Sequence, residues 1–230
     1  MTCIVGLGLH GRLWFGGDAA VTSLELQGVL TVPKVFRVGP YTIGVRGAFR
    51  VAQVLQYRLR PPEHNPGDAD DVVGHLTTTF VDAIRTVISK DQEAGNRFSD
   101  KYDLLVGYLG RIAHIDSDGT VFEHDEPGYA IGKGAQPARG DLYALDGLDV
   151  APEEIIRRSL VAAASCTQFV RPPFWVLGPV TSAPDRSRPY TAVRRARSLC
   201  RSGRSRSGVL SLPCCGSLWA DCPTSTPAVW

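Results

Sequence analysis

The sequence predicts an α+β fold in which two stacked sheets carry helices on both outer faces, a four-layer αββα sandwich. Strand patterns lead the chain, helical patterns then come in pairs, and a short strand pattern at residues 174–177 closes the series. With 230 residues, of which 43% are hydrophobic, the chain is long enough to bury such a core. We expect one folded domain over residues 1–177, followed by a tail.

The chain opens with a strand hairpin. Residues 2–9 are an apolar run that is typical of a buried strand. His10-Gly11-Arg12 indicates a turn, and the return strand begins with residues 13–15. Gly16-Gly17 lets the backbone bend and pack closely, which would bring Asp18 back beside the start of the first strand.

Two further strands are expected at residues 35–38 and 41–45, joined by the turn at Gly39-Pro40. Lys34 begins this pair. A lysine on an apolar strand is costly unless an anion holds it, and Asp18 is the expected anion.

Two helical patterns follow. Gly47 closes the strand, and apolar residues at helical spacing predict a helix over about residues 48–59. A loop rich in proline covers residues 60–67. A longer helix is then expected, capped by the aspartate at position 70 or 71 and running to about residue 89.

The second half of the domain is expected to hold a hairpin at residues 103–115 and two more helices. Asp116-Ser117-Asp118-Gly119 is interpreted as a turn in preference to a functional carboxylate pair. Helices are predicted at about residues 136–145 and from the segment 149–154, where proline and acidic residues suit a first turn. Gly132-Lys133-Gly134 lacks the other features of a dinucleotide-binding motif.

The N-terminus carries a candidate nucleophile. Thr2 follows Met1, and a small residue at this position favours removal of the methionine by an aminopeptidase. The mature chain would then begin with a free α-amine beside the threonine hydroxyl. The reference pKa of that amine is about 7.7–8.0, so it can accept the hydroxyl proton near neutral pH. A threonine activated by its own amine is a known arrangement for covalent catalysis.

Three short segments carry a family resemblance: Met-Thr-Cys-Ile-Val at residues 1–5, Phe-Gly-Gly-Asp at 15–18 and Pro-Lys-Val-Phe-Arg at 33–37. Together they resemble the proteasome β-subunit superfamily of N-terminal-nucleophile (Ntn) hydrolases, and the short HslV-type peptidases above all. They match that family's threonine, aspartate and lysine in identity and spacing. The resemblance covers roughly residues 2–177 and implies the αββα sandwich.

The resemblance also implies a threonine peptidase that hydrolyses peptides or unfolded proteins, without a cofactor or a metal. Thr2 would attack the substrate, Lys34 would stabilise the charged state, and Asp18 would orient Lys34. The backbone amide of Gly47, or that of Ala48, would hold the oxyanion. An ammonium beside Thr2 would favour the alkoxide and lower the pKa of the amine by repulsion.

A substrate pocket follows from the same comparison. In the family, the residue two or three positions before the oxyanion glycine floors this pocket. Arg46 lies at that turn and Arg50 follows one helical turn later, with Val21, Val32 and Phe36 as expected walls. A guanidinium at the floor would favour an acidic residue before the cut. The alternative is that Arg46 points outward into a subunit interface.

The sequence departs from the family pattern at two places. Lys133 stands where the family usually has a serine between two glycines, and Ser165-Cys166-Thr167-Gln168 replaces a supporting aspartate and serine, with Thr167 as a weak substitute. A catalytically inactive ring subunit therefore remains an alternative to a peptidase. In either case the expected partner is the chain itself, as a homo-oligomeric ring. Whether an ATPase unfoldase supplies substrate stays open.

Composition narrows the setting. No apolar run reaches the ~18 residues of a membrane span, and the first residues lack the basic start of a signal peptide, so we expect a cytoplasmic protein. Cys3 and Cys166 fall in apolar segments and are expected in the core. The other four cysteines have no zinc-ligand spacing.

The tail at residues 178–230 has a different composition, with eight arginines, two aspartates and no lysine. The rest of the chain is then mildly acidic, which disfavours a general nucleic-acid surface. Serine, arginine, proline and glycine without periodicity predict a disordered segment. A binding arm for an acidic partner or nucleic acid and an out-of-frame translation of GC-rich DNA are the two interpretations.

Overall fold

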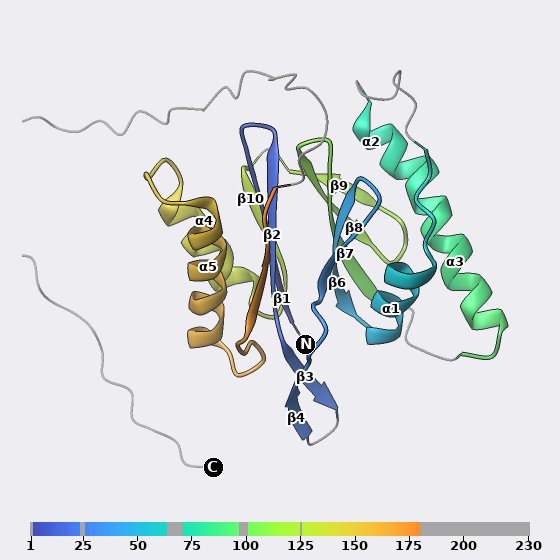
Figure 1. Cartoon of the computed structure of the whole chain (residues 1–230), viewed down its shortest axis with the longest axis horizontal. Helices are drawn as coiled ribbons and strands as arrows, with labels where there is room; N and C mark the ends of the chain where they lie inside the picture. The colour runs from blue at the N-terminus through green and yellow to red at the C-terminus, as the bar shows by residue number, and fades with distance from the viewer. Residues whose placement is uncertain (1, 24–25, 64–70, 97–100, 125, 180–230) are drawn as a thin grey trace, which may run out of the picture. The chain divides into compact units, whose positions relative to one another are not determined.

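The structure is a computed structural model that describes residues 2–23, 26–63, 71–96, 101–124 and 126–179 (Figure 1). The strands are β1 (Cys3–Leu9), β2 (Arg12–Asp18), β3 (Ala20–Ser23), β4 (Leu26–Val29), β5 (Val35–Val38), β6 (Tyr41–Gly47), β7 (Tyr102–Tyr108), β8 (Arg111–Asp116), β9 (Val121–Glu123), β10 (Gly128–Gly132) and β11 (Phe174–Leu177). The helical elements are α1 (Phe49–Arg58), α2 (Val72–His75), the π-helical segment η2 (Leu76–Phe80), α3 (Val81–Glu93), α4 (Ala135–Leu145) and α5 (Pro152–Cys166).

Two antiparallel sheets form the centre of the fold. The first has the strand order β10-β1-β2-β11, and the second has the order β5-β6-β7-β8-β9. Helices α4 and α5 pack against the outer face of the first sheet, and α1 and α3 pack against that of the second (Figure 1). The predicted four-layer αββα sandwich is therefore confirmed.

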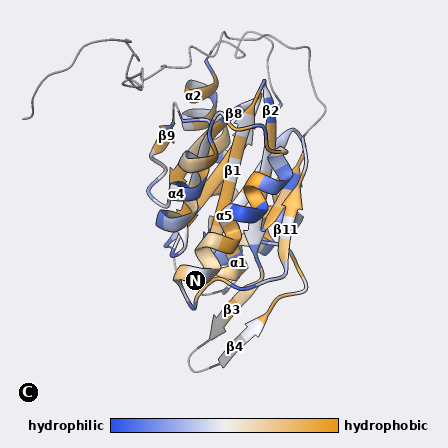
Figure 2. Cartoon of the chain, turned by 90° about the vertical axis from the view of Figure 1, so that its left-hand side faces the viewer, coloured by the Kyte–Doolittle hydropathy of each residue, from blue (hydrophilic) through white to orange (hydrophobic). Residues whose placement is uncertain are grey.

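Side-chain alternation along β1 explains how this strand joins two layers. Cys3, Val5 and Leu7 belong to the cluster under α4 and α5, whereas Ile4 belongs to the cluster between the sheets. In Figure 2 the central strand β1 is largely hydrophobic, while α4 and α5 turn hydrophilic residues toward the viewer. This is the pattern of a strand that is buried on both faces.

Glycines let the layers approach closely. A Cβ atom at Gly16 on β2 would lie 2.3 Å from Cγ2 of Ile156 on α5. A Cβ atom at Gly44 on β6 would lie 2.3 Å from Cγ2 of Ile4 on the other sheet. The packing role predicted for the Gly16-Gly17 pair thus has a clear steric basis, since the space that a side chain would need is already filled.

The predicted helix between residues 70 and 89 is divided and longer than expected. Asp71 caps it, since its Oδ1 accepts a hydrogen bond from the Gly74 amide at 2.8 Å. The segment η2 then interrupts the α-helical pattern before α3 runs on to Glu93. Within this region the Thr78 hydroxyl donates to the Gly74 carbonyl at 2.8 Å, a bond that commonly bends helices.

Some expectations need correction. The β3–β4 hairpin and the short strand β9 were not predicted. Cys3 is buried as expected, but Cys166 is exposed because it ends α5.

The turn at residues 116–119 is confirmed by a hydrogen bond from the Gly119 amide to the Asp116 carbonyl at 2.9 Å. Within the described residues, no helix is long and apolar enough to cross a membrane. The predicted tail lies outside the described residues, except for residues 178–179.

Candidate active site

The three residues singled out at the N-terminus meet around one carboxylate. The Thr2 hydroxyl donates to Oδ1 of Asp18 at 2.8 Å. The Lys34 ammonium donates to the same oxygen at 2.9 Å. All three side chains are buried. The structure therefore brings together the hydroxyl, the carboxylate and the ammonium that the spacing predicted.

Strand pairing and backbone bonds fix this arrangement. In the β1–β2 hairpin Ile4 lies opposite Gly17, which places Asp18 beside the start of β1. Asp18 Oδ1 also accepts the Cys3 amide at 2.9 Å, and its Oδ2 accepts the Ala20 amide at 2.9 Å. The Lys34 carbonyl accepts the Val45 amide at 3.1 Å, which ties Lys34 to strand β6. Four donors thus satisfy the buried carboxylate, as a buried charge requires.

Burial controls the titration of the neighbouring groups. Desolvation lowers the pKa of Lys34 below its ordinary value, and the Asp18 carboxylate opposes this effect. Desolvation, together with the Asp18 charge, raises the pKa of the Cys3 thiol to about 12. A thiol with that pKa stays protonated near neutral pH and is a poor nucleophile. Cys3 is therefore a core residue in this structure, although it lies next to Thr2.

A cavity of about 150 Å³ opens on Thr2. Its lining residues come from several elements and are mostly apolar: Thr2, Ala20, Val21, Leu30, Lys34, Val45, Gly47, Ala48, Phe49 and Ala52. The backbone at positions 47 and 48 reaches this wall because α1 begins directly after it, and the start of a helix offers amides without intrahelical acceptors.

The conformation of Gly47 allows only glycine. Its φ angle is +122°, and an added Cβ atom would lie 2.5 Å from the carbonyl oxygen of Lys101. Both the backbone angle and the lack of space exclude a side chain. The strand-to-helix turn that carries the candidate oxyanion amides is therefore built around this residue.

The structure divides the predicted substrate-binding residues. Val21 lines the Thr2 cavity, but Val32, Phe36, Arg46 and Arg50 are not among its lining residues. Phe36 packs instead in the core beneath α1 and α3. The guanidinium of Arg50 pairs with Asp91 on α3.

Val45, the neighbour of Arg46 in sequence, takes the place that was predicted for Arg46. Val45 lines the Thr2 cavity, whereas Arg46 pairs with Asp103, its cross-strand partner on β7. Successive side chains of a strand point to opposite faces, so a shift of one residue moves the arginine away from the cavity. Counting two residues back from Gly47 would have identified Val45.

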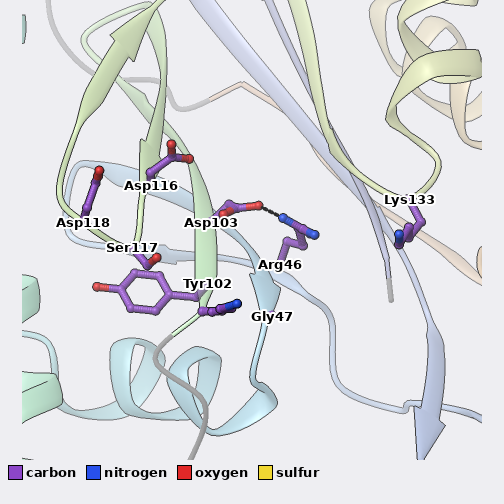
Figure 3. A pocket seen from close by; sticks show the side chains of 9 residues that line it. Arg46, Gly47, Tyr102, Asp103, Asp116, Ser117, Asp118 and Lys133 are labelled. Atoms are coloured by element: carbon purple, nitrogen blue, oxygen red, sulfur yellow. Dashed lines mark hydrogen bonds and ion pairs between the residues drawn. The ribbon is translucent and has the colours of Figure 1, made fainter.

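Arg46 contributes to a second cavity, of about 450 Å³ (Figure 3). Figure 3 shows Arg46 paired with Asp103, with Lys133 on one side and Asp116 and Asp118 on the other. Gly47 lines this cavity as well as the Thr2 cavity, so the two adjoin at that residue.

A cluster with ligand-type atoms lies beside the second cavity. Within the described residues, Asp103, His114 and Asp116 bring such atoms within 4.8 Å of one another. Arg46 already neutralises the Asp103 carboxylate, and Nε2 of His114 lies 3.1 Å from Asp116. We therefore assign no metal to this cluster.

At the first position that departs from the resembled family's pattern, a lysine stands in place of a hydroxyl-bearing residue. Lys133 is exposed and lines the second cavity. The Thr167 hydroxyl accepts the Phe169 amide at 3.3 Å, within its own loop. Gly132 packs tightly on the site, because a Cβ atom there would lie 2.2 Å from the Thr2 carbonyl oxygen.

Comparison with known proteins gives a fold match. No protein-family model and no curated protein sequence matches the chain. Among solved structures, Thiobacillus denitrificans BPH in complex with epoxomicin is similar with a TM-score of 0.65 and 19% identity, covering 79% of this chain and 100% of that one. HslV from Trypanosoma brucei gives a TM-score of 0.56 at 20% identity, covering 76% and 98%.

Anbu from Yersinia bercovieri gives a TM-score of 0.57 at 19% identity, covering 77% of this chain and 81% of that one. These similarities extend over most of the described domain. The predicted resemblance is thereby confirmed at the level of the fold, which is that of the proteasome-like Ntn hydrolases.

Proposed function

We propose that this chain is an N-terminal threonine peptidase, which hydrolyses amide bonds of peptides or unfolded proteins once Met1 has been removed. One observation carries the proposal: at the wall of a cavity, the Thr2 hydroxyl and the Lys34 ammonium both donate to Oδ1 of Asp18, at 2.8 and 2.9 Å. The fold of HslV and its relatives supports the same chemistry without identifying the substrate.

The reaction would use groups of this chain alone. Thr2 Oγ1 attacks the substrate carbonyl while the freed α-amine takes the hydroxyl proton. The amide at Gly47 or Ala48 stabilises the oxyanion, and Lys34, oriented by Asp18, stabilises the negative charge near Thr2. The ammonium of Thr2 then gives its proton to the departing amine. The acyl part of the substrate stays bound to Thr2 Oγ1 as an ester. Water then hydrolyses the ester by the same proton path.

The cavity supports a revised specificity. Its side-chain walls near Thr2 include Ala20, Val21, Val45 and Ala52, and its volume of about 150 Å³ is small. We infer that the residue before the cut is small and apolar, in place of the acidic residue expected from Arg46. Burial of a matching apolar side chain would supply the binding energy.

We further propose that the chain acts in the cytoplasm as a homo-oligomer that encloses Thr2. One similar structure, at 19% identity and a TM-score of 0.54, shows a helical assembly of Anbu from Pseudomonas aeruginosa. This makes self-association a reasonable expectation for the present chain. A peptide substrate is the other expected partner, and an ATPase unfoldase is left open.

The alternative function is that of an inactive structural subunit of such an assembly. The observation in its favour is that Lys133, which stands in place of the expected serine, lines a different cavity from that of Thr2 and brings no hydroxyl to the nucleophile. The fold match is compatible with both functions.

Labelling of the purified protein with an epoxyketone such as epoxomicin separates the two functions. An epoxyketone offers two electrophilic carbons, which an N-terminal threonine can engage with its hydroxyl and its amine. Intact mass should show loss of Met1 and one added inhibitor on the trimmed species only, so any species that retains Met1 serves as an internal control. Retention of Met1 in all molecules would exclude the peptidase.

Thr2→Ala should abolish both labelling and peptide hydrolysis while the protein stays folded. Ser165→Ala, at an exposed position near the end of α5, is the control and should behave like the unmodified chain. Residual hydrolysis above about a tenth of the unmodified rate would contradict Thr2 as the nucleophile, since loss of a nucleophile costs several orders of magnitude.

A further inference from the structure

One buried carboxylate binds both ends of helix α1. Asp91, near the end of α3, is fully buried. Arg50, the second residue of α1, donates from Nε to Oδ2 at 2.8 Å and from Nη2 to Oδ1 at 2.5 Å. Arg58, the last residue of α1, donates from Nη1 to Oδ1 at 2.6 Å. The first and last turns of a ten-residue helix are thus attached to one point on α3.

The charges of this group favour a persistent contact. The hydrogen bonds from Arg50 lower the pKa of the Asp91 carboxyl, so the group is ionised near neutral pH. Arg50 and Arg58 are 35% and 54% exposed, which lets water solvate them if the carboxylate loses its charge. Neutralising Asp91 should therefore loosen α1 without leaving a buried unpaired cation.

The position of α1 matters because this helix begins at the candidate active site. Gly47 and Ala48 line the Thr2 cavity, and Phe49 starts the helix. A cation such as Arg50 in the first turn opposes the helix dipole, so its presence needs another explanation. Pairing with Asp91 supplies one. Any sliding of α1 along α3 would also move the amides at positions 47 and 48.

We propose that Asp91 is a positioning residue, which holds α1 through Arg50 and Arg58 so that the backbone amides of Gly47 and Ala48 stay aligned with Thr2. The role of these amides rests on the proposed function, whereas the restraint on α1 does not. Two measurements therefore address the two parts separately.

The first measurement is amide hydrogen exchange in Asp91→Asn, with Asp82→Asn as the control. Asp82 lies on the same helix and is exposed, and within the described part of the chain its side chain makes no hydrogen bond or ion pair with α1. We expect exchange over residues 47–52 to accelerate about tenfold or more in Asp91→Asn alone, because local opening becomes easier. Unchanged exchange over these residues would overturn the proposal.

The second measurement compares a peptide aldehyde with the corresponding alcohol as inhibitors. The aldehyde can add to Thr2 Oγ1 and place an oxyanion at the amides, whereas the alcohol only occupies the cavity. In Asp91→Asn, kcat and aldehyde affinity should both fall about 10- to 100-fold, with little change in KM or alcohol affinity. Equal losses for both inhibitors would indicate general loosening and overturn the proposal.

Failure of the proposed function has a different signature. The unmodified protein would then neither hydrolyse peptides nor favour the aldehyde over the alcohol. The exchange experiment would still decide whether Asp91 holds α1.

Discussion

Asp18 shows how much of the site a single side chain organises. Its two oxygens accept bonds from Thr2, Lys34 and the amides of Cys3 and Ala20. This grouping could be predicted because a buried lysine needs an anion and because the hairpin returns Asp18 to the start of β1. Arg46 was expected to line the same cavity, but it lines the second cavity and Val45 lines the first. Neighbouring strand residues point to opposite faces, so an alignment shifted by one residue interchanges them.

The pH dependence of peptide hydrolysis follows from two of these groups. The α-amine of Thr2 must be neutral to accept a proton, so kcat/KM should rise with pH up to about 7.7–8.0 or somewhat below, as the Lys34 charge lowers the amine's pKa. Lys34 must stay charged, and burial lowers its pKa, so activity should fall on the alkaline side earlier than for an ordinary lysine. A fluorogenic peptide assayed across this range should give a bell-shaped profile.

Asp18→Asn provides the control for this assignment. The carboxylate is the main group that raises the pKa of Lys34 against the effect of burial. Its removal should shift the alkaline limb to lower pH in addition to slowing the reaction. An alkaline limb that stays in place would show that another group titrates there.

Val45 should determine the size of the residue before the cut. Val45→Ala enlarges the cavity beside Thr2, so substrates with a larger apolar residue before the cut should gain kcat/KM relative to those with a smaller one. The ratio of the two kcat/KM values should change by at most about 10- to 200-fold for each added methylene. Arg46→Ala is the matched control, because this side chain lines the second cavity. If Arg46→Ala changes the substrate preference in a panel of fluorogenic peptides and Val45→Ala does not, the original expectation of a pocket for acidic residues would be supported instead.

At the scale of elements, apolar periodicity predicted most of the layers, and local chemistry explains the exceptions. The helix ending at Glu93 was placed correctly at its start, because Asp71 is a good cap. The insertion of η2 was not predictable from apolar spacing, since the bond from Thr78 to Gly74 lies on the exposed side. The β3–β4 hairpin was missed because, among the described residues, its two strands form a separate two-stranded sheet, and its sequence shows little apolar alternation.

The contact between β2 and α5 should tolerate no added methyl group. Gly16→Ala would place a Cβ atom 2.3 Å from Ile156, and overpacking of this kind typically costs about 1–3 kcal/mol of unfolding free energy. Gly140→Ala on α4 is the control, because that position is open and alanine favours a helix by about 0.5–1 kcal/mol. In urea denaturation, the midpoint concentration should be lower for Gly16→Ala than for the unmodified chain. For Gly140→Ala it should be slightly higher.

At the scale of the whole molecule, the fold explains the site only in part. The sandwich brings β1, β2 and β6 together around Thr2, and this could be predicted from the order of elements and the resemblance. Enclosing the site from solvent would require surfaces outside this sandwich, such as those of neighbouring copies of the chain. Several large apolar side chains are exposed on different elements, including Tyr57 on α1 and Tyr143 on α4, each 73% exposed.

We expect the purified protein to form a homo-oligomer at micromolar concentration. A peptidase that hydrolyses unfolded proteins needs its nucleophile confined, and self-association would let a chain of this size enclose it. Exposed aromatic residues such as Tyr57 and Tyr143 are the kind that interfaces favour. Sedimentation velocity is the measurement, and a monomer alone at all concentrations would contradict this expectation.

A chain shortened to residues 1–179 provides the control for the C-terminal segment. The removed part carries eight arginines, whereas the rest of the chain is mildly acidic, so non-specific electrostatic association could imitate an assembly at low salt. The shortened chain should form the same oligomer, and moderate salt should leave it intact, because an interface built from apolar contacts is not screened. Dissociation in salt, or on shortening, would attribute the association to the basic segment and would leave Thr2 without the predicted enclosure.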